Sequence, residues 1–170
     1  MDDLTDERLQ SWFRFCYRLA ETSPDTSTQN GAILVGEAGL PFARGTNTFT
    51  RGAIVSPERL ERPAKYSFIE HAERNAIYDA ARKGVSTQDL TMACVWAACA
   101  DCARAIVQAG VTRLVRHAVF FDGNDRWAES IALGDAILKE GGVEIVDWRG
   151  VVLEAPPILH DGSLFYADRA

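Results

Sequence analysis

The stretch that decides the fold runs from Glu70 to Val119 and reads EHAERNAIYDAARKGVSTQDLTMACVWAACADCARAIVQAGVTRLVRHAV. Its apolar residues alternate between helical and strand-like spacing, and Gly84 and Gly110 end the two helical parts. The predicted elements are a helix over 70–82, a strand over 90–96, a helix over 101–108 and a strand over 111–119. This alternation favours parallel strands joined by crossover helices.

The flanking segments extend this pattern and add an antiparallel edge. Upstream, the sequence predicts an amphipathic helix over 4–20 and a hairpin of two strands over 31–35 and 40–46. Downstream, it predicts a helix over 125–140 and a last strand over 143–148. The predicted fold class is therefore α/β, a three-layer α/β/α sandwich with a mixed five-stranded sheet.

Two further segments have little regular pattern. Residues 47–69 contain Gly52, Pro57 and Pro63, and an ordered loop of this length is uncommon unless it serves a site. The tail, 150–170, is partly apolar, so we expect it to pack on the body or on a neighbouring subunit. The sequence contains no repeat, low-complexity tract or linker, which predicts a single domain over 1–170.

Composition limits the class of protein. The chain has 170 residues, of which 47% are hydrophobic and 25% charged, as in one globular domain with one core. No apolar run approaches the roughly 20 residues of a membrane span, and the acidic start MDDLTDERLQ is unlike a signal peptide. These features predict a cytoplasmic protein without a membrane partner.

The charge balance argues against a nucleic-acid partner. The net charge is −6, whereas a domain that binds long nucleic acids usually presents a basic face. One stretch is locally richer in positive charge and contains Arg44, Arg51, Arg59, Arg62 and Lys65. It is interpreted either as a solvated loop or as an anion site for one phosphate.

The four cysteines divide into two pairs. Cys16 falls in the apolar stripe of the first predicted helix, and Cys94 falls in an apolar strand, so both are expected to be buried small hydrophobic residues. A disulfide framework is not expected in a chain of this class. Cys99 and Cys102 need another explanation.

Two short motifs lie at the starts of consecutive predicted helices. His71-Ala-Glu73 and Cys99-Ala-Asp-Cys102 are each common alone, but together they offer one imidazole and two thiolates, a set of three zinc ligands. Cysteines at i and i+3 project from one helical turn, and a helix N-terminus favours the thiolate. A catalytic zinc keeps its fourth position for water, whereas a closed structural site needs another Cys or His.

These motifs resemble those of the zinc-dependent cytidine and deoxycytidylate deaminase superfamily, whose signature is H-x-E followed by P-C-x-x-C. The resemblance extends over about residues 10–150. Residues 31–35 are similar to the family's first strand, residues 45–52 to its substrate-side loop, and Lys65-Tyr66 to the deoxycytidylate branch. The resemblance implies a cytidine-deaminase-like fold and a Zn²⁺ cofactor held by His71, Cys99 and Cys102.

The resemblance also implies a reaction. Zinc would activate a water molecule as hydroxide, and Glu73 would pass the water proton to the ring nitrogen and then to the leaving amino group. The product would be the oxo form of an aminopyrimidine nucleotide such as dCMP, together with ammonia. The substrate-binding candidates that the resemblance or their position suggests are Asn47, Arg51, Lys65, Tyr66, Ala72 and Asn75.

Two positions depart from the family pattern. Ala98 stands where the family has proline before the first cysteine, which affects the stiffness of the turn but contacts no metal. Thr50 stands where the deoxycytidylate branch has proline before Arg-Gly, which weakens the substrate assignment more than the chemistry.

Alternative functions remain open at this point. The substrate is a nucleotide, a nucleoside, or a cytosine, purine or pterin base; a non-catalytic zinc-binding module is the alternative that an intact Glu73 disfavours. The family resemblance also implies a homo-oligomer. A candidate interface lies in the tail, at Leu159, Leu164, Phe165 and Tyr166, although burial on its own domain explains these residues equally well.

Overall fold

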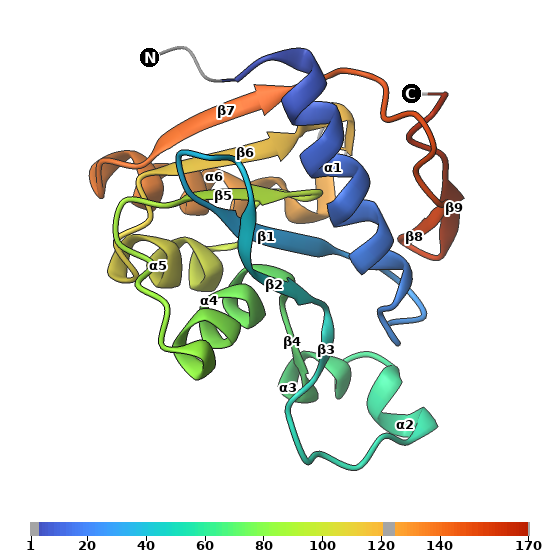
Figure 1. Cartoon of the computed structure of the whole chain (residues 1–170). Coiled ribbons are helices and arrows are strands. Elements are labelled where there is room, and N and C mark those ends of the chain that lie inside the picture. The colour runs from blue at the N-terminus through green and yellow to red at the C-terminus, as the bar shows by residue number, and fades with distance from the viewer. Residues whose placement is uncertain (1–3, 121–124, 170) are drawn as a thin grey trace.

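The computed structural model describes residues 4–120 and 125–169, and its middle layer is a five-stranded sheet (Figure 1). The strands, in spatial order, are β2 (Pro41–Thr46), β1 (Gly31–Val35), β5 (Thr91–Cys94), β6 (Arg113–His117) and β7 (Glu144–Trp148). Strand β1 is antiparallel to both β2 and β5, whereas β5, β6 and β7 are parallel. The mixed sheet and the antiparallel hairpin at its edge confirm the predicted fold class.

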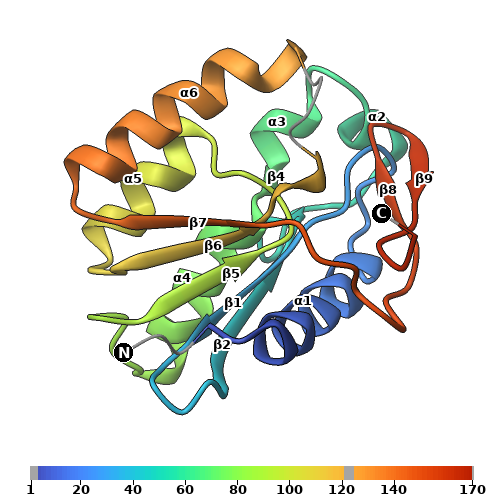
Figure 2. The ribbon, with the colours of Figure 1, turned by 90° about the horizontal axis from the view of Figure 1, so that it is seen from above.

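Helices cover both faces of this sheet (Figure 2). Helix α1 (Asp6–Glu21) packs on one face together with the C-terminal segment. Helices α4 (Ala72–Lys83), α5 (Ala100–Gln108) and α6 (Asp125–Glu140) cover the other face. Every helix of the described residues is too short or too polar to cross a bilayer.

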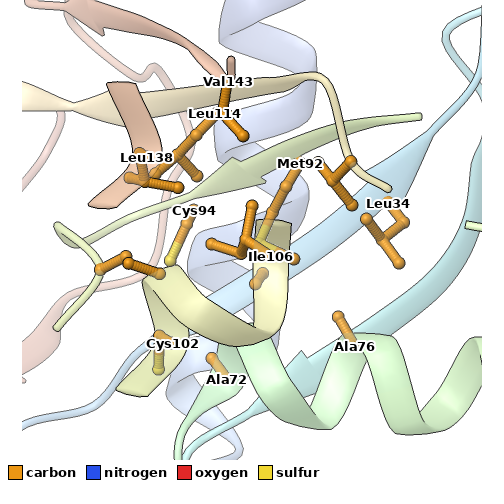
Figure 3. Packing of buried hydrophobic residues seen from close by; sticks show 14 of the residues in the cluster. Leu34, Ala72, Ala76, Met92, Cys94, Cys102, Ile106, Leu114, Leu138 and Val143 are labelled. Atoms are coloured by element: carbon orange, nitrogen blue, oxygen red, sulfur yellow. The ribbon is translucent and has the colours of Figure 1, made fainter. Parts of the chain in front are cut away.

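Each face has its own apolar core. On the α4–α5–α6 face, alanines of α4 and Ile106 of α5 pack under Met92 and Leu114 of the sheet (Figure 3). On the opposite face, Phe13, Cys16 and Tyr17 of α1 are fully buried. The small alanine side chains bring the first turn of α4 close to the sheet, which places the residues at that helix end under the strand ends.

Gly45 makes the close approach of β2 to α4 possible. A Cβ atom at this position would lie 2.2 Å from the Ala72 carbonyl oxygen and 2.4 Å from the Ala76 nitrogen. Both distances are shorter than any van der Waals contact, so a larger residue would push the strand away from the helix start. The sequence Gly45-Thr-Asn47 therefore fixes the position of the next loop against the start of α4.

The irregular segments contain short elements that the sequence pattern did not predict. Residues 47–70 form β3 (Thr48–Phe49), α2 (Pro57–Leu60), α3 (Lys65–Phe68) and β4 (Ile69–Glu70). The tail forms a hairpin of β8 (Ile158–His160) and β9 (Ser163–Phe165), and a short 3-10 turn, η1 (Ala118–Phe120), follows β6. Elements of two to four residues are too short to show a periodicity, which is why the pattern missed them.

Helix α4 starts two residues later than predicted because Ile69 and Glu70 pair with β3. His71 consequently becomes the N-cap residue of α4, with an extended backbone. The tail packs on the body of the chain, where Val152, Ile158 and Ala167 are buried in the α1-side core. Residues 1–3, 121–124 and 170 of the predicted domain lie outside the described residues.

Candidate functional site

Two helix N-termini bring His71, Cys99 and Cys102 together. His71 is the N-cap residue of α4, Cys99 is the N-cap residue of α5, and Cys102 lies in the first turn of α5. The Nδ1 atom of His71 lies 3.6 Å from the Cys99 sulfur and 3.5 Å from the Cys102 sulfur. All three ligand atoms lie within 4.8 Å of one another.

This arrangement fits a tetrahedral zinc ion. Zinc lies about 2.1 Å from an imidazole nitrogen and about 2.3 Å from a thiolate, so tetrahedral angles separate its ligands by about 3.5–3.8 Å. The two nitrogen–sulfur distances agree with that separation. The donor set of one nitrogen and two sulfurs is also one that zinc prefers over magnesium or calcium.

Hydrogen bonds favour the thiolate form of Cys99, whereas the hydrogen bond with Cys99 and burial raise the pKa of Cys102. The hydrogen bond with the Cys102 thiol lowers the pKa of Cys99 to about 3, and the hydrogen bond with His71 acts in the same direction. Nη1 of Arg74 lies 3.4 Å from the Cys102 sulfur, and Arg74 also pairs with Glu70. Arg74, which the sequence analysis did not select, therefore offers a positive charge to the site.

Glu73 lies in the first turn of α4, two residues after His71, and is almost completely buried, with 1% of its surface exposed. Burial raises the pKa of its carboxyl group, and the charge of His71 partly opposes that effect. The Nδ2 atom of Asn30 donates a hydrogen bond to Glu73 Oε2 at 3.3 Å. A buried carboxyl group beside three metal-ligating atoms has the position and environment of a general acid–base group.

A cleft opens in front of His71, Glu73 and Cys99. Its space, open solvent included, is about 700 Å³. Its aromatic walls are Tyr66 and Trp127, which make an edge-on contact, and Trp96, whose ring makes a tilted contact with His160 of β8 at 4.3 Å between centroids. The remaining lining residues are Asp25, Thr28, Asn30, Asn47, Arg62, Lys65, Ile69, Ala97, Ser130 and Ile131.

Asn47 and Asn75 both brace the start of α4. Asn47 lines the cleft, accepts a hydrogen bond from the Ala72 backbone N–H through Oδ1, and donates one to the Thr28 carbonyl through Nδ2, each at 3.0 Å. Asn75 donates to the carbonyl groups of Thr46 and Glu70. Neither Asn75 nor the fully buried Ala72 belongs to the cleft lining, so their substrate roles stay predictions.

The two cations of the cleft differ in their environment. Lys65 is buried, and its Nζ atom donates to both oxygens of the buried Asp25 at 2.8 Å. Arg62 is 40% exposed, and its Nη2 atom donates to Ser27 Oγ and to Asp161 Oδ1, each at 2.8 Å. The structure thus assigns the accessible positive charge of the cleft to Arg62 instead of Lys65.

Of the two remaining predicted substrate-binding residues, Tyr66 lies in the cleft and Arg51 lies outside it. Tyr66 lines the cleft and is 47% exposed. Arg51 is exposed in the turn after β3 and does not belong to the lining. Asp25, Asn30 and Trp127 also line the cleft, but the sequence did not indicate them. Each lies far in sequence from the metal-ligating residues, in a segment that contains no recognisable motif.

Comparison with known proteins agrees with this geometry. Residues 6–118 match the model of a family described as the cytidine and deoxycytidylate deaminase zinc-binding region. The chain is 30% identical over 144 residues to an uncharacterized deaminase in the luxG 3′ region of Aliivibrio fischeri, a match that covers 81% of this chain and 93% of that protein.

Two viral proteins are also similar. The deoxycytidylate deaminase of Enterobacteria phage T2 is 39% identical over 86 residues, which cover 48% of this chain and 42% of the phage protein. The chain therefore matches less than half of that enzyme's length. The crystal structure of dCMP deaminase from cyanophage S-TIM5 in complex with dCMP and dUMP has the same fold, with a TM-score of 0.67 at 22% identity over 85% of this chain and 99% of that one.

Proposed function

Since the chain belongs to the cytidine and deoxycytidylate deaminase family, we propose that it is a hydrolytic deaminase that converts an aminopyrimidine nucleotide such as dCMP to its oxo product and ammonia. The observation that carries the proposal is that Glu73 lines the same cleft as His71 and Cys99, whose ligand atoms cluster with that of Cys102. A structural zinc site has no use for a buried carboxyl group beside its ligands, whereas hydrolysis requires one.

Zinc is the cofactor of this family's zinc-binding region, and His71, Cys99 and Cys102 are the residues that would hold it. When bound, zinc supplies Lewis-acid activation, which makes water a competent nucleophile near neutral pH. His71 and Cys99 both line the cleft, so a zinc ion held by these residues would be within reach of a substrate bound there.

Glu73 would handle the protons of the reaction. Its carboxylate accepts a proton from the attacking water and delivers it to the ring nitrogen beside the reacting carbon. The water oxygen bonds to that carbon, the carbon–nitrogen bond breaks, and Glu73 transfers the second water proton to the departing amino group. Burial, which raises the pKa of Glu73, brings the carboxyl group closer to the range in which it both accepts and donates a proton.

The cleft walls would hold the base and the phosphate. The aromatic side chains Trp96, Trp127 and Tyr66 offer flat apolar surfaces against which a pyrimidine ring can pack. The amide group of Asn47 has two N–H donors, and one of them donates to the Thr28 carbonyl, so the other is available to the substrate. Arg62 would bind the phosphate, because its half-exposed guanidinium lines the cleft and has five N–H donors, of which the bonds to Ser27 and Asp161 use those of Nη2.

The proposal includes a homo-oligomer and a cytoplasmic location. Leu164 and Tyr166 of the C-terminal hairpin are exposed and would supply apolar surface to a second copy. All four cysteines are free, and thiolate ligands persist in a reducing compartment.

A parallel substrate assay tests the proposed function. The zinc-loaded protein is incubated with dCMP, CMP, deoxycytidine, cytosine and guanine, and ammonia release is measured for each compound. We expect dCMP to have the highest kcat/KM. A preference for an unphosphorylated compound would show that the substrate is a nucleoside or a base. If none of the compounds releases ammonia, the proposed deamination of these substrates is contradicted.

Glu73→Gln is the matched variant for this assay. The amide keeps the shape of the side chain but cannot carry the proton, so we expect kcat to fall by about 10²–10⁴-fold, the range of general acid–base effects. Zinc content, measured by elemental analysis, should stay at the wild-type value. Turnover that survives in this variant would refute the proton-transfer role of Glu73.

A further inference from the structure

Glu73 has a buried partner that the family motif does not contain. Asn30 is 4% exposed, and its Nδ2 atom lies 3.3 Å from Glu73 Oε2. The same nitrogen lies 3.4 Å from the sulfur of the buried Cys94, which in turn lies 3.5 Å from Asn30 Oδ1. Among the described residues, Asn30 is the one side chain that donates a hydrogen bond to this carboxyl group.

The backbone holds Asn30 in place from both sides. Its carbonyl oxygen accepts hydrogen bonds from Thr46 Oγ1 at 2.8 Å and from the Asn47 N–H at 3.2 Å. The next residue, Gly31, passes so close to α1 that a Cβ atom would lie 2.1 Å from the Cys16 carbonyl oxygen. Since strand and helix meet without space between them, Asn30 projects from a fixed point of the sheet.

We propose that Asn30 is a positioning residue for the deamination reaction: its amide group holds Glu73 Oε2 as a permanent acceptor and leaves Oε1 as the oxygen that carries the proton. The proposal rests on the proposed function, because it assigns a proton-transfer role to Glu73. The orientation of the amide follows from chemistry, since an ionised carboxylate only accepts hydrogen bonds and an NH₂ group only donates them.

A fixed carboxylate matters because proton transfer depends on geometry. A general base works only within hydrogen-bond reach of the proton that it takes, and a group free to rotate spends part of its time out of reach. Glu73 gives and receives protons at two points of the reaction, so the same oxygen must face the cleft at both. The bond to Asn30 lies on the sheet side of the carboxyl group and restricts that rotation.

The test compares Asn30→Ala and Asn30→Asp with Cys94→Ala. Both Asn30 variants remove the donor, and Asn30→Asp keeps the shape of the side chain while it faces Glu73 with a second carboxyl group. Loss of an outer-shell partner typically costs about 10–100-fold in activity. We expect kcat for dCMP to fall by that factor in Asn30→Ala and further in Asn30→Asp, with KM within about twofold of wild type and unchanged zinc content. Cys94→Ala keeps the donor to Glu73, so its kcat should stay close to wild type.

The outcomes separate three roles for Asn30. A rise in KM with unchanged kcat would make Asn30 a substrate contact, and a loss of zinc in both variants would make it a structural residue; either result overturns the proposal. If Asn30→Ala does not fold, the near-isosteric Asn30→Asp decides. Equal kcat losses in Cys94→Ala would also overturn it, because that variant retains the bond to Glu73.

Crystal structures of the zinc-loaded wild type and Asn30→Ala provide a readout without turnover. We expect the Asn30–Glu73 hydrogen bond in the wild type and a rotated Glu73 carboxyl group in the variant. A Glu73 side chain that keeps its position without Asn30 overturns the proposal. This readout holds even if the wild type deaminates none of the tested compounds, a result that would contradict the proposed function alone.

Discussion

The two walls of the cleft are built in different ways. The metal-side wall is formed by His71, Glu73 and Cys99, which lie, like the third ligand Cys102, at the N-termini of two helices that pack on the same sheet face. The opposite wall is assembled from the loop before β1, the α3 region and α6. These segments are far apart in sequence and are joined by contacts such as the Asp25–Lys65 ion pair and the edge-on contact of Tyr66 with Trp127.

The difference concerns how each wall is stabilised. Apolar packing of the helices positions the metal-side residues. Their polar side chains are therefore not needed to hold the wall together and can bind the metal or transfer the proton. On the opposite wall, charged groups are used to hold loops together, as in the Asp25–Lys65 pair. A substitution on the first wall should therefore remove the reaction, whereas one on the second should change stability or substrate choice.

The largest effect is expected for Cys102→Ser. The hydroxyl group is a poor zinc ligand compared with a thiolate, so the variant should lose the metal and with it all measurable ammonia release. Elemental analysis after dialysis measures zinc per chain. Cys16→Ala is the matched control, because Cys16 is equally buried but lies in the core on the other face of the sheet. Zinc retained in Cys102→Ser at the wild-type content would disprove its role as a ligand.

The same contrast explains what the sequence could predict. His71 and Glu73, like Cys99 and Cys102, lie within one helical turn of each other, so their spacing alone places them at one helix end. Asp25 and Lys65 are separated by 40 residues, and Asn30 and Glu73 by 43. No periodicity connects such pairs, since they meet only after the sheet and the loops have folded. The sheet itself was predictable because its strands and crossover helices are long enough to show a pattern.

The opposite wall depends on the buried pair of Asp25 and Lys65. Lys65→Met would leave the Asp25 carboxylate without its cation, which for a buried pair costs about 3–5 kcal/mol of unfolding free energy. Urea denaturation of the zinc-loaded protein measures this loss. The double variant Asp25→Asn/Lys65→Met should regain part of it, because the amide oxygen can still accept from the Ser27 and Thr28 N–H groups.

An exposed pair supplies the control for Lys65. Lys83 Nζ lies 2.6 Å from Asp79 Oδ2, a distance similar to that in the Asp25–Lys65 pair, but the Lys83 side chain is 46% exposed. Lys83→Met should therefore lower the free energy of unfolding by less than about 1 kcal/mol. If the two lysine variants lose similar amounts of stability, the Asp25–Lys65 pair is not what holds this wall together.

The smallest effect, and the most selective, is expected for Arg62→Ala. The Arg62–Asp161 pair is exposed, so its loss should change the unfolding free energy by less than about 1 kcal/mol. A hydrogen bond to a charged phosphate is worth about 1.5–3 kcal/mol, which corresponds to a fall of about 10–100-fold in kcat/KM for dCMP. Deoxycytidine lacks the phosphate, so its kcat/KM should stay near the wild-type value, and Arg59→Ala, outside the cleft lining, should leave both substrates unaffected. Equal losses for dCMP and deoxycytidine would show that Arg62 acts on the shape of the wall and does not bind the phosphate.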